Sequence, residues 1–207
     1  MLTNHGADWQ RQRTLMQGIF SPQRMAGFHD IFVGCSEQLA SQWLAELESQ
    51  GGCFRRDIYP DLTMLFLDIV GDAALGINFG ALSGRGGELL SSIRFILKQS
   101  TYPTHQFMAW WQRLPLPSNR QLADAFALVD DFLYGFIHQR RAAIQQGVAC
   151  SESLLDVLLQ ATEPGEDALT DKEVRDNLLA IIVNGYETVA TSTGITLDLL
   201  ARHPEQL

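Results

Sequence analysis

The stretch LLAIIVNGYETVATSTGITLDLL, residues 178–200, decides how this chain folds, because apolar residues recur at helical spacing on both sides of a polar cluster. Thr170 and Glu173 form the T-x-x-E pattern of a capping box, so the sequence predicts a helix that begins at Asp171. The His-Pro pair at 203 and 204 ends it. A helix of about 32 residues would be roughly 48 Å long and would cross a whole domain.

Four polar side chains share one face in the middle of this predicted helix. They are spaced i, i+3, i+4 and i+7, and they are Asn184, Glu187, Thr188 and Thr191, with Gly185 beside them. A threonine hydroxyl can bond to the carbonyl four residues earlier, and a glycine lowers the cost of bending, so we expect the helix to deform here. Two interpretations follow. The cluster is either a buried polar network with Glu187 paired to an arginine, or a widened groove for a small ligand, with an acid and an alcohol that deliver protons.

The rest of the chain also has helical periodicity, broken by short glycine and proline segments, so the predicted fold class is all-α. We find no internal repeat and no linker to a second domain. The stretch 102–119 is predicted to be irregular. Further helices are expected at about 8–20, 23–50, 61–80, 88–100, 120–146 and 154–160.

Composition limits the possible functions. The chain has 207 residues, of which 46% are hydrophobic and 19% charged, enough for one domain with its own core. Its net charge of −9 argues against nucleic acid as a partner, which requires a positive face. No apolar run of about 18 residues is present, and the three cysteines, Cys35, Cys53 and Cys150, lack the spacing of a metal site. We therefore predict reduced thiols, no bound metal ion held by this chain alone, and a cytoplasmic location.

Two further pairs of residues are candidates for binding. Trp9 and Arg13 are i, i+4 neighbours, so an indole N–H and a guanidinium can converge on one anion, although the arginine can equally stack on the tryptophan. Asp130 and Asp131 are similar to the metal-binding acids of prenyl-chain enzymes, but without a further acid at suitable spacing a solvated helix face is the favoured interpretation.

Taken in order, these segments resemble the haem-thiolate monooxygenases, the cytochrome P-450 superfamily. GADWQRQRTLMQGIFSP, residues 6–22, is similar to the family's C-helix pattern W-x-x-x-R. NGYETVATS, residues 184–192, is similar to its I-helix pattern (A/G)-G-x-(E/D)-T. DIVGDAALGINFG, LPLPSNR, HQRRAA, SLLDVLLQA and LLARHPEQL also match family text in the family's order, so the resemblance covers essentially the whole chain.

The resemblance implies a haem b cofactor and roles for six residues. Trp9 and Arg13 would donate to a haem propionate, and Gly185 would lie over the distal haem face. Glu187 and Thr188 would be the acid and alcohol that relay protons to dioxygen. The sixth, Asn184, stands where the family usually has Ala or Gly, so its amide could crowd dioxygen or bond to it; Tyr186 replaces a commonly seen His.

The resemblance also implies partners: a small apolar organic substrate beneath the helices around 95–111, dioxygen, and a ferredoxin or flavin reductase as electron donor. The sequence stops before the family's E-x-x-R helix and its cysteine loop, and it begins at the C helix. We therefore expect residues 1–207 to be a single partial domain, a central fragment that lacks the thiolate ligand and is inactive alone. The alternative is a truncated, non-catalytic helical module that binds haem weakly or binds a protein partner.

Overall fold

The computed structural model describes residues 5–17, 20–85, 87–100, 114, 116–148, 153–160 and 169–206. These residues contain helices and no strand, which confirms the all-α prediction. The helices are α1 (Gly6–Gln17), α2 (Pro22–Gly27), α3 (His29–Ser49), α4 (Tyr59–Leu75), α5 (Gly87–Ser100), α7 (Pro117–Gln145), α8 (Leu154–Gln160) and α9 (Asp171–Arg202), followed by the short 3-10 helix η2 (Pro204–Gln206).

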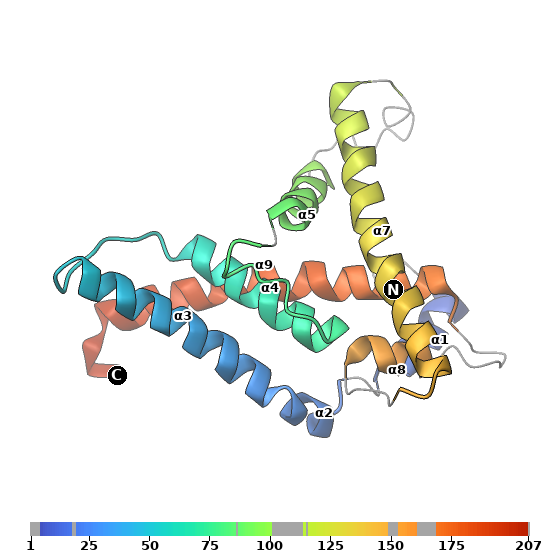
Figure 1. Ribbon diagram of the computed structural model, residues 1–207, viewed down its shortest axis with the longest axis horizontal. Helices are drawn as coiled ribbons and strands as arrows, with labels where there is room; N and C mark the ends of the chain where they lie inside the picture. The colour runs from blue at the N-terminus through green and yellow to red at the C-terminus, as the bar shows by residue number, and fades with distance from the viewer. Residues whose placement is uncertain are drawn as a thin grey trace.

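Helix α9 crosses the whole molecule and organises the other helices around it (Figure 1). Helix α4 packs along α9 and α3 packs on α4, whereas α7 crosses α9 and carries α5 beside it. Helices α1 and α8 lie near the N-terminal end of α9 (Figure 1). The main core forms where α4, α7, α8 and α9 meet, and its fully buried side chains include Leu67, Leu178, Ile182 and Tyr186. This core fixes one side of α9 and leaves the opposite side bare.

The 32-residue length and both ends of α9 agree with the prediction from the sequence. Three other predicted helices differ. The helix predicted at 8–20 is α1, which begins at Gly6 and ends at Gln17, and Phe20 lies in a turn. The predicted helix at 23–50 is divided into α2 and α3 at Phe28, whose ring is buried in the core. The predicted helix at 61–80 ends at Leu75, because Gly76 adopts the left-handed conformation with φ of 71° and its N–H bonds to the carbonyl of Asp72. The C-cap glycine therefore stops α4 earlier than the apolar pattern suggests.

The loop that follows α4 is fixed by a buried carboxylate. Asp68 has no exposed surface, and it accepts hydrogen bonds from the backbone N–H groups of Ala81 at 2.8 Å and Leu82 at 3.0 Å. A buried carboxylate that accepts two backbone N–H groups is well satisfied. Asp68 thereby positions the segment that leads into α5.

Several predictions fall outside the described residues. They concern most of the irregular stretch 102–119, including Trp110 and Trp111, the loop at 161–168, and Cys150. None of the helices in the described part of the chain combines the length and the apolar character needed to cross a membrane.

Candidate functional site

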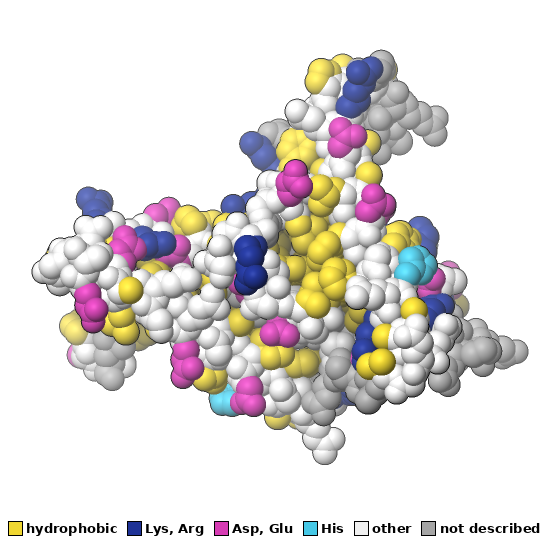
Figure 2. Space-filling model, in the orientation of Figure 1, with side chains coloured by type: hydrophobic (Ala, Val, Ile, Leu, Met, Phe, Trp, Pro, Cys, Tyr) yellow, Lys and Arg dark blue, Asp and Glu magenta, His cyan; other side chains and the backbone are white. Residues whose placement is uncertain are grey.

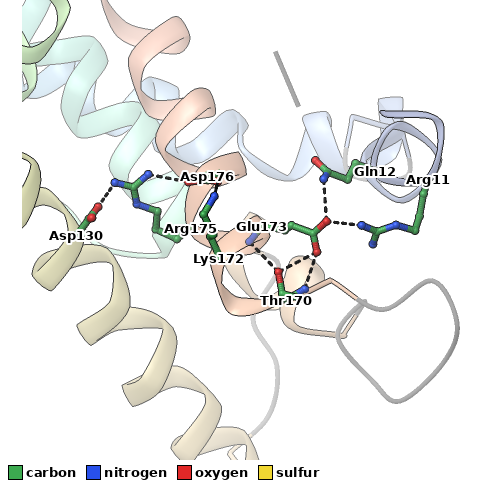
Figure 3. Close-up of polar contacts among 8 residues, drawn as sticks. All are labelled: Arg11, Gln12, Asp130, Thr170, Lys172, Glu173, Arg175 and Asp176. Atoms are coloured by element: carbon green, nitrogen blue, oxygen red, sulfur yellow. Dashed lines mark hydrogen bonds and ion pairs between the residues drawn. The ribbon is translucent and has the colours of Figure 1, made fainter. Parts of the chain in front are cut away.

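The N-terminus of α9 has a complete capping box (Figure 3). The Glu173 backbone N–H donates to the Thr170 hydroxyl at 3.2 Å. In return, Glu173 Oε2 accepts hydrogen bonds from the Thr170 backbone N–H at 2.8 Å and from the Thr170 hydroxyl at 2.9 Å. The predicted helix start is confirmed, and it uses only one oxygen of the Glu173 carboxylate.

The other oxygen of this carboxylate holds α1. Glu173 Oε1 accepts a hydrogen bond from Gln12 Nε2 at 2.9 Å and a charged one from the Arg11 guanidinium (Figure 3). Burial alone would raise the pKa of Glu173, but the Thr170 N–H and the Arg11 guanidinium outweigh it and lower that pKa below its ordinary value. Glu173 therefore stays ionised and joins α9 to α1, where Gln12 is 161 positions away in sequence.

The polar side chains in the middle of α9 are exposed. The Asn184 amide donates to the carbonyl of Ala180 at 2.7 Å, and the Thr188 hydroxyl donates to the carbonyl of Asn184 at 2.6 Å. The Thr191 hydroxyl donates to the carbonyl of Glu187 at 2.9 Å. In the described part of the chain Glu187 has no ion pair, so the buried-network interpretation is wrong. We call Asn184, Glu187, Thr188 and Thr191 the polar stripe.

The predicted deformation of the helix is also wrong. Helix α9 is α-helical from Asp171 to Arg202, through the whole polar stripe. The physical reason is that the side chains of Asn184, Thr188 and Thr191 each donate to a carbonyl four residues earlier. A carbonyl oxygen has two lone pairs, so it can accept from the side chain and from the backbone N–H together. The stripe is a bare face of a regular helix.

Gly185 points to the side of α9 that packs against α4. A Cβ added to Gly185 would lie 2.9 Å from Val70 Cγ2 and 3.5 Å from Val70 Cγ1. The absence of a side chain here is explained by the close approach of the two helices. The proposed place of Gly185 over a haem stays a prediction.

Helix α1 carries the predicted anion-binding pair. The Arg13 guanidinium lies over the Trp9 ring, 5.0 Å from its centroid, so the stacking interpretation describes the geometry. Within the residues that the structure describes, Arg13 has no carboxylate partner. The arginine is exposed and the tryptophan is half-buried. Both donors are therefore available to an anionic ligand.

The stripe and α1 lie on the same face of α9. Glu173 and Asn184 are eleven residues apart, which is about three turns of an α-helix and roughly 16 Å along its axis. Because the contacts to Arg11 and Gln12 are made from Glu173, α1 covers the N-terminal end of the face that carries the polar stripe. The bare part of this face is consequently bounded at one end by the helix that presents Trp9 and Arg13.

Asn177, on the same face between Glu173 and Asn184, was missed in the sequence analysis. Its side chain is 1% exposed, and neither its amide nitrogen nor its amide oxygen has a hydrogen-bond partner among the described residues. Such an unpaired buried amide is costly, which indicates a polar group or water that completes it. Asn177 lies seven residues, about two helical turns, before Asn184, and this spacing in the sequence could have placed it on the same face.

The alternative candidates find no support in the geometry. Asp130 forms an ion pair with Arg175, so it is neither a free metal ligand nor simply solvated (Figure 3). The described residues contain no group of three or more His, Cys, Asp or Glu side chains that could hold a metal. Cys35 is buried in α3, and burial followed by the charge of Asp68 raises the pKa of its thiol. Cys53 is exposed.

An apolar groove of about 660 Å³ lies between α7 and the segment from α4 to α5. Figure 2 shows the hydrophobic side chains gathered in the angle between α7 and the body of the molecule. Phe79, Phe132 and Phe136 form its aromatic wall, with ring centroids 5.6 Å and 4.8 Å apart in successive pairs. Of the predicted substrate-covering stretch 95–111, residues 95–100 belong to α5 and the others lie outside the described residues.

Comparison with known proteins identifies the family. The cytochrome P450 family profile matches residues 1–206, so the chain belongs to the cytochrome P450 family. It is 27% identical to "11-oxo-beta-amyrin 30-oxidase" of Glycyrrhiza uralensis over 97% of this chain and 39% of the relative. It is 29% identical to "Cytochrome P450 4ae1" of Drosophila melanogaster over 98% of this chain and 42% of the relative.

A solved structure gives the same assignment of fold. The crystal structure of a cytochrome P450, CYP102L1, superposes with a TM-score of 0.80 and 20% sequence identity, covering 98% of this chain and 44% of that chain. The chain spans about two-fifths of the length of the curated relatives it matches. The helices described above therefore correspond to the helical part of the P450 fold.

Proposed function

We propose that this chain is the part of a haem-dependent monooxygenase that holds the propionate edge of the haem and delivers protons while dioxygen oxidises a small apolar organic substrate. In this proposal residues 1–207 form a single partial domain. The observation that carries it is the polar stripe of α9, an exposed face bounded at one end by α1, the helix that carries Trp9 and Arg13. Membership of the cytochrome P450 family supports haem as the cofactor.

The donor set fits a haem propionate. A carboxylate is recognised well by a guanidinium together with a second N–H donor, and Trp9 and Arg13 supply both from adjacent turns of α1. The exposed side chains of Asn184, Thr188 and Thr191 are short and extend little from α9, so that a flat ligand can lie against the helix.

Haem b, when bound, supplies the one-electron and dioxygen chemistry that amino-acid side chains do not have. The residues of this chain contribute binding and proton delivery. The Thr188 hydroxyl donates to the Asn184 carbonyl, so its oxygen can accept a hydrogen bond from a ligand; rotation of the hydroxyl then turns it into a donor. Exposed Glu187, the residue directly before Thr188, can collect protons from water and supply them to this hydroxyl.

Asn184 stands where the family usually has Ala or Gly, so its amide adds a polar group to the proposed site. Its Nδ2 is held by the Ala180 carbonyl, which leaves Oδ1 as an acceptor next to Thr188. We propose that Oδ1 accepts a hydrogen bond from water or substrate beside the haem. The electron donor, a ferredoxin or a flavin reductase, and a cytoplasmic location belong to the same proposal.

The experiment that tests the function is electron coupling in the complete protein. Thr188→Ala should lower the amount of product formed per electron pair consumed, because protons then reach dioxygen without control. Thr188→Ser keeps the hydroxyl and should keep the coupling. Thr191→Ala is the matched control, since Thr191 makes the same bond to a carbonyl four residues earlier. Unchanged coupling in Thr188→Ala, or an equal loss in Thr191→Ala, would remove Thr188 from this role.

One observation favours the second candidate, a non-catalytic helical module that binds a protein partner. Ile195 and Leu199, in the C-terminal part of α9, are 57% and 51% exposed. Large apolar side chains exposed together are typical of a surface that another protein covers. Titration of the complete protein with haemin distinguishes the two candidates. Stoichiometric binding with a defined absorption band supports the monooxygenase, and the absence of binding supports the module.

A further inference from the structure

We infer that the apolar groove between α7 and the segment from α4 to α5 is a second binding site, which takes a small aromatic carboxylate with its acid group on Arg85. The groove has a volume of about 660 Å³, which is within the range of ordinary ligand sites. The argument needs three features: an aromatic wall, a wall that is already formed, and a cation at the rim.

Three phenylalanine rings form one wall of the groove. The rings of Phe79 and Phe132 are tilted by 51° with centroids 5.6 Å apart, and those of Phe132 and Phe136 are tilted by 55° with centroids 4.8 Å apart. All three side chains are only half-buried, so part of each ring is left to face the groove. Because aromatic rings attract one another in tilted and offset arrangements, this wall favours a flat aromatic body.

The wall is formed before a ligand arrives. The Phe79 ring lies against α4 in the space that a side chain at position 71 would fill, and Gly71 has none. The residues that follow are fixed by Asp68, which accepts hydrogen bonds from the backbone N–H groups of Ala81 and Leu82. A preformed site loses little conformational entropy on binding, so a small ligand can bind with few contacts.

Arg85 supplies a cation at the rim of the groove. Gly80 adopts the left-handed conformation with φ of 67°, and a Cβ there would lie 2.6 Å from Arg85 Nε, so the arginine side chain packs directly on the glycine backbone. The Arg85 backbone N–H also donates to the Gly80 carbonyl at 2.9 Å. In the described part of the chain Arg85 is exposed and has no carboxylate partner. Such a guanidinium can form two parallel hydrogen bonds to the acid group of a ligand.

Glu88 is the other charged side chain that lines the groove. It lies in the first turn of α5, where the helix dipole favours an acid, and it also lines a neighbouring depression with Ser91, Gln121 and Asp124. The start of α5 therefore accounts for Glu88, whereas no carboxylate among the described residues accounts for Arg85. Glu88 would repel a second acid group, so the site favours a monocarboxylate.

The groove is separate from the polar stripe. Phe79, Phe132 and Phe136 pack against the main core, which lies on the side of α9 opposite the stripe. The residues that line the groove belong to neither α1 nor α9. The inference therefore does not rest on the proposed function, and a ligand in the groove would not touch a haem held at the stripe.

Isothermal titration calorimetry of the complete protein with 2-naphthoate tests the inference. 2-Naphthylmethanol and 2-naphthylmethylamine carry the same ring system with a neutral and a cationic group. We expect 2-naphthoate to bind most tightly and Arg85→Gln to weaken it by about tenfold, as for the loss of one charged hydrogen bond, while binding of the neutral probe changes by less than about twofold. Arg120→Gln is the matched control, because Arg120 is an exposed arginine of α7 that does not line the groove; it should leave the affinities unchanged.

Two further variants locate the probe. Leu128→Trp fills the groove from α7 and should weaken binding of all the probes, whereas Glu88→Gln should leave 2-naphthoate binding unchanged or tighten it. The inference is overturned if Arg85→Gln does not weaken 2-naphthoate binding or weakens the neutral probe equally, if the amine binds most tightly, or if Leu128→Trp has no effect. The haem absorption spectrum is recorded in the same titrations. If the binding that Arg85→Gln weakens shifts this spectrum, the probe lies at the haem and the inference fails.

Discussion

Gly185→Ala should destabilise the protein, although alanine is the better helix former. Gly185 lies inside α9 at its contact with α4, where an added Cβ would be 2.9 Å from Val70 Cγ2, 3.5 Å from Val70 Cγ1 and 3.8 Å from Val70 Cβ. The first of these distances is below any ordinary carbon–carbon contact. Valine cannot move away easily, because its branched Cβ restricts χ1 to one rotamer in a helix. The two helices would have to separate.

The magnitude follows from two opposing effects. Alanine in place of glycine in a helix interior stabilises by about 1 kcal/mol. Overpacking of a well-packed contact costs about 1–3 kcal/mol. We expect a net loss of about 1 kcal/mol in the free energy of unfolding. Val70→Ala removes both Cγ atoms that the new Cβ would meet, so Gly185→Ala made in that background should become neutral or stabilising.

The assay is chemical denaturation of the four proteins of this double-mutant cycle, followed by circular dichroism. Gly194→Ala is the matched control in the same helix: its Cβ would meet only Leu62 Cδ1 at 3.5 Å, an ordinary contact, so this change should stabilise by about 0.5–1 kcal/mol. The reasoning is refuted if Gly185→Ala stabilises as much as Gly194→Ala, or if the Val70 background makes no difference.

Three further outcomes are expected in the same assay. Arg140→Met should destabilise by about 3–5 kcal/mol, because Asp156 has no exposed surface and accepts two hydrogen bonds from Arg140, at 2.6 Å and 2.7 Å; adding Asp156→Leu should recover most of the loss. Burial, followed by the charge of Glu187, raises the pKa of Tyr186 to about 12, so the contribution of Tyr186 to stability is full below the ordinary pKa of 10.0 and falls as pH rises toward 12. Tyr186→Phe should abolish this fall and, since the buried hydroxyl has no hydrogen-bond partner among the described residues, stabilise by about 1 kcal/mol. The lowered pKa of Glu173 gives stability the opposite pH dependence: the contribution of Glu173 is full above the ordinary pKa of 4.5 and is lost as pH falls through the lowered value. Glu173→Gln should therefore flatten the acid side of the curve of stability against pH. An unchanged curve would contradict this.

The sequence predicted the helices best where local chemistry marks their ends. The capping box at Thr170 and the His-Pro pair at 203 and 204 predicted both ends of α9 correctly. Elsewhere the apolar pattern continued past the true end of a helix. At Phe28 and Gly76 the break depends on where a ring is buried and on a backbone with positive φ, and both are set by tertiary packing.

The chemistry of the candidate site was less accessible from the sequence. Spacing alone placed Asn184, Glu187, Thr188 and Thr191 on one face, but it could not say whether other helices covered that face. The structure shows the face exposed, which excludes the buried network. The contact between Glu173 and α1 joins residues 161 positions apart, and no local pattern reports a partner at that distance.

The geometry of α9 also limits what the motif at 184–188 can do. Consecutive residues project about 100° apart around a helix, so five consecutive residues cannot all face one ligand. Asn184 and Thr188 share the bare face, whereas Gly185 points to Val70 and Tyr186 is buried in the core. The glycine therefore serves the approach of α4, and that approach holds the bare face in place from behind. A substitution at Gly185 should consequently change stability first and affect a ligand on the stripe only through the position of α9.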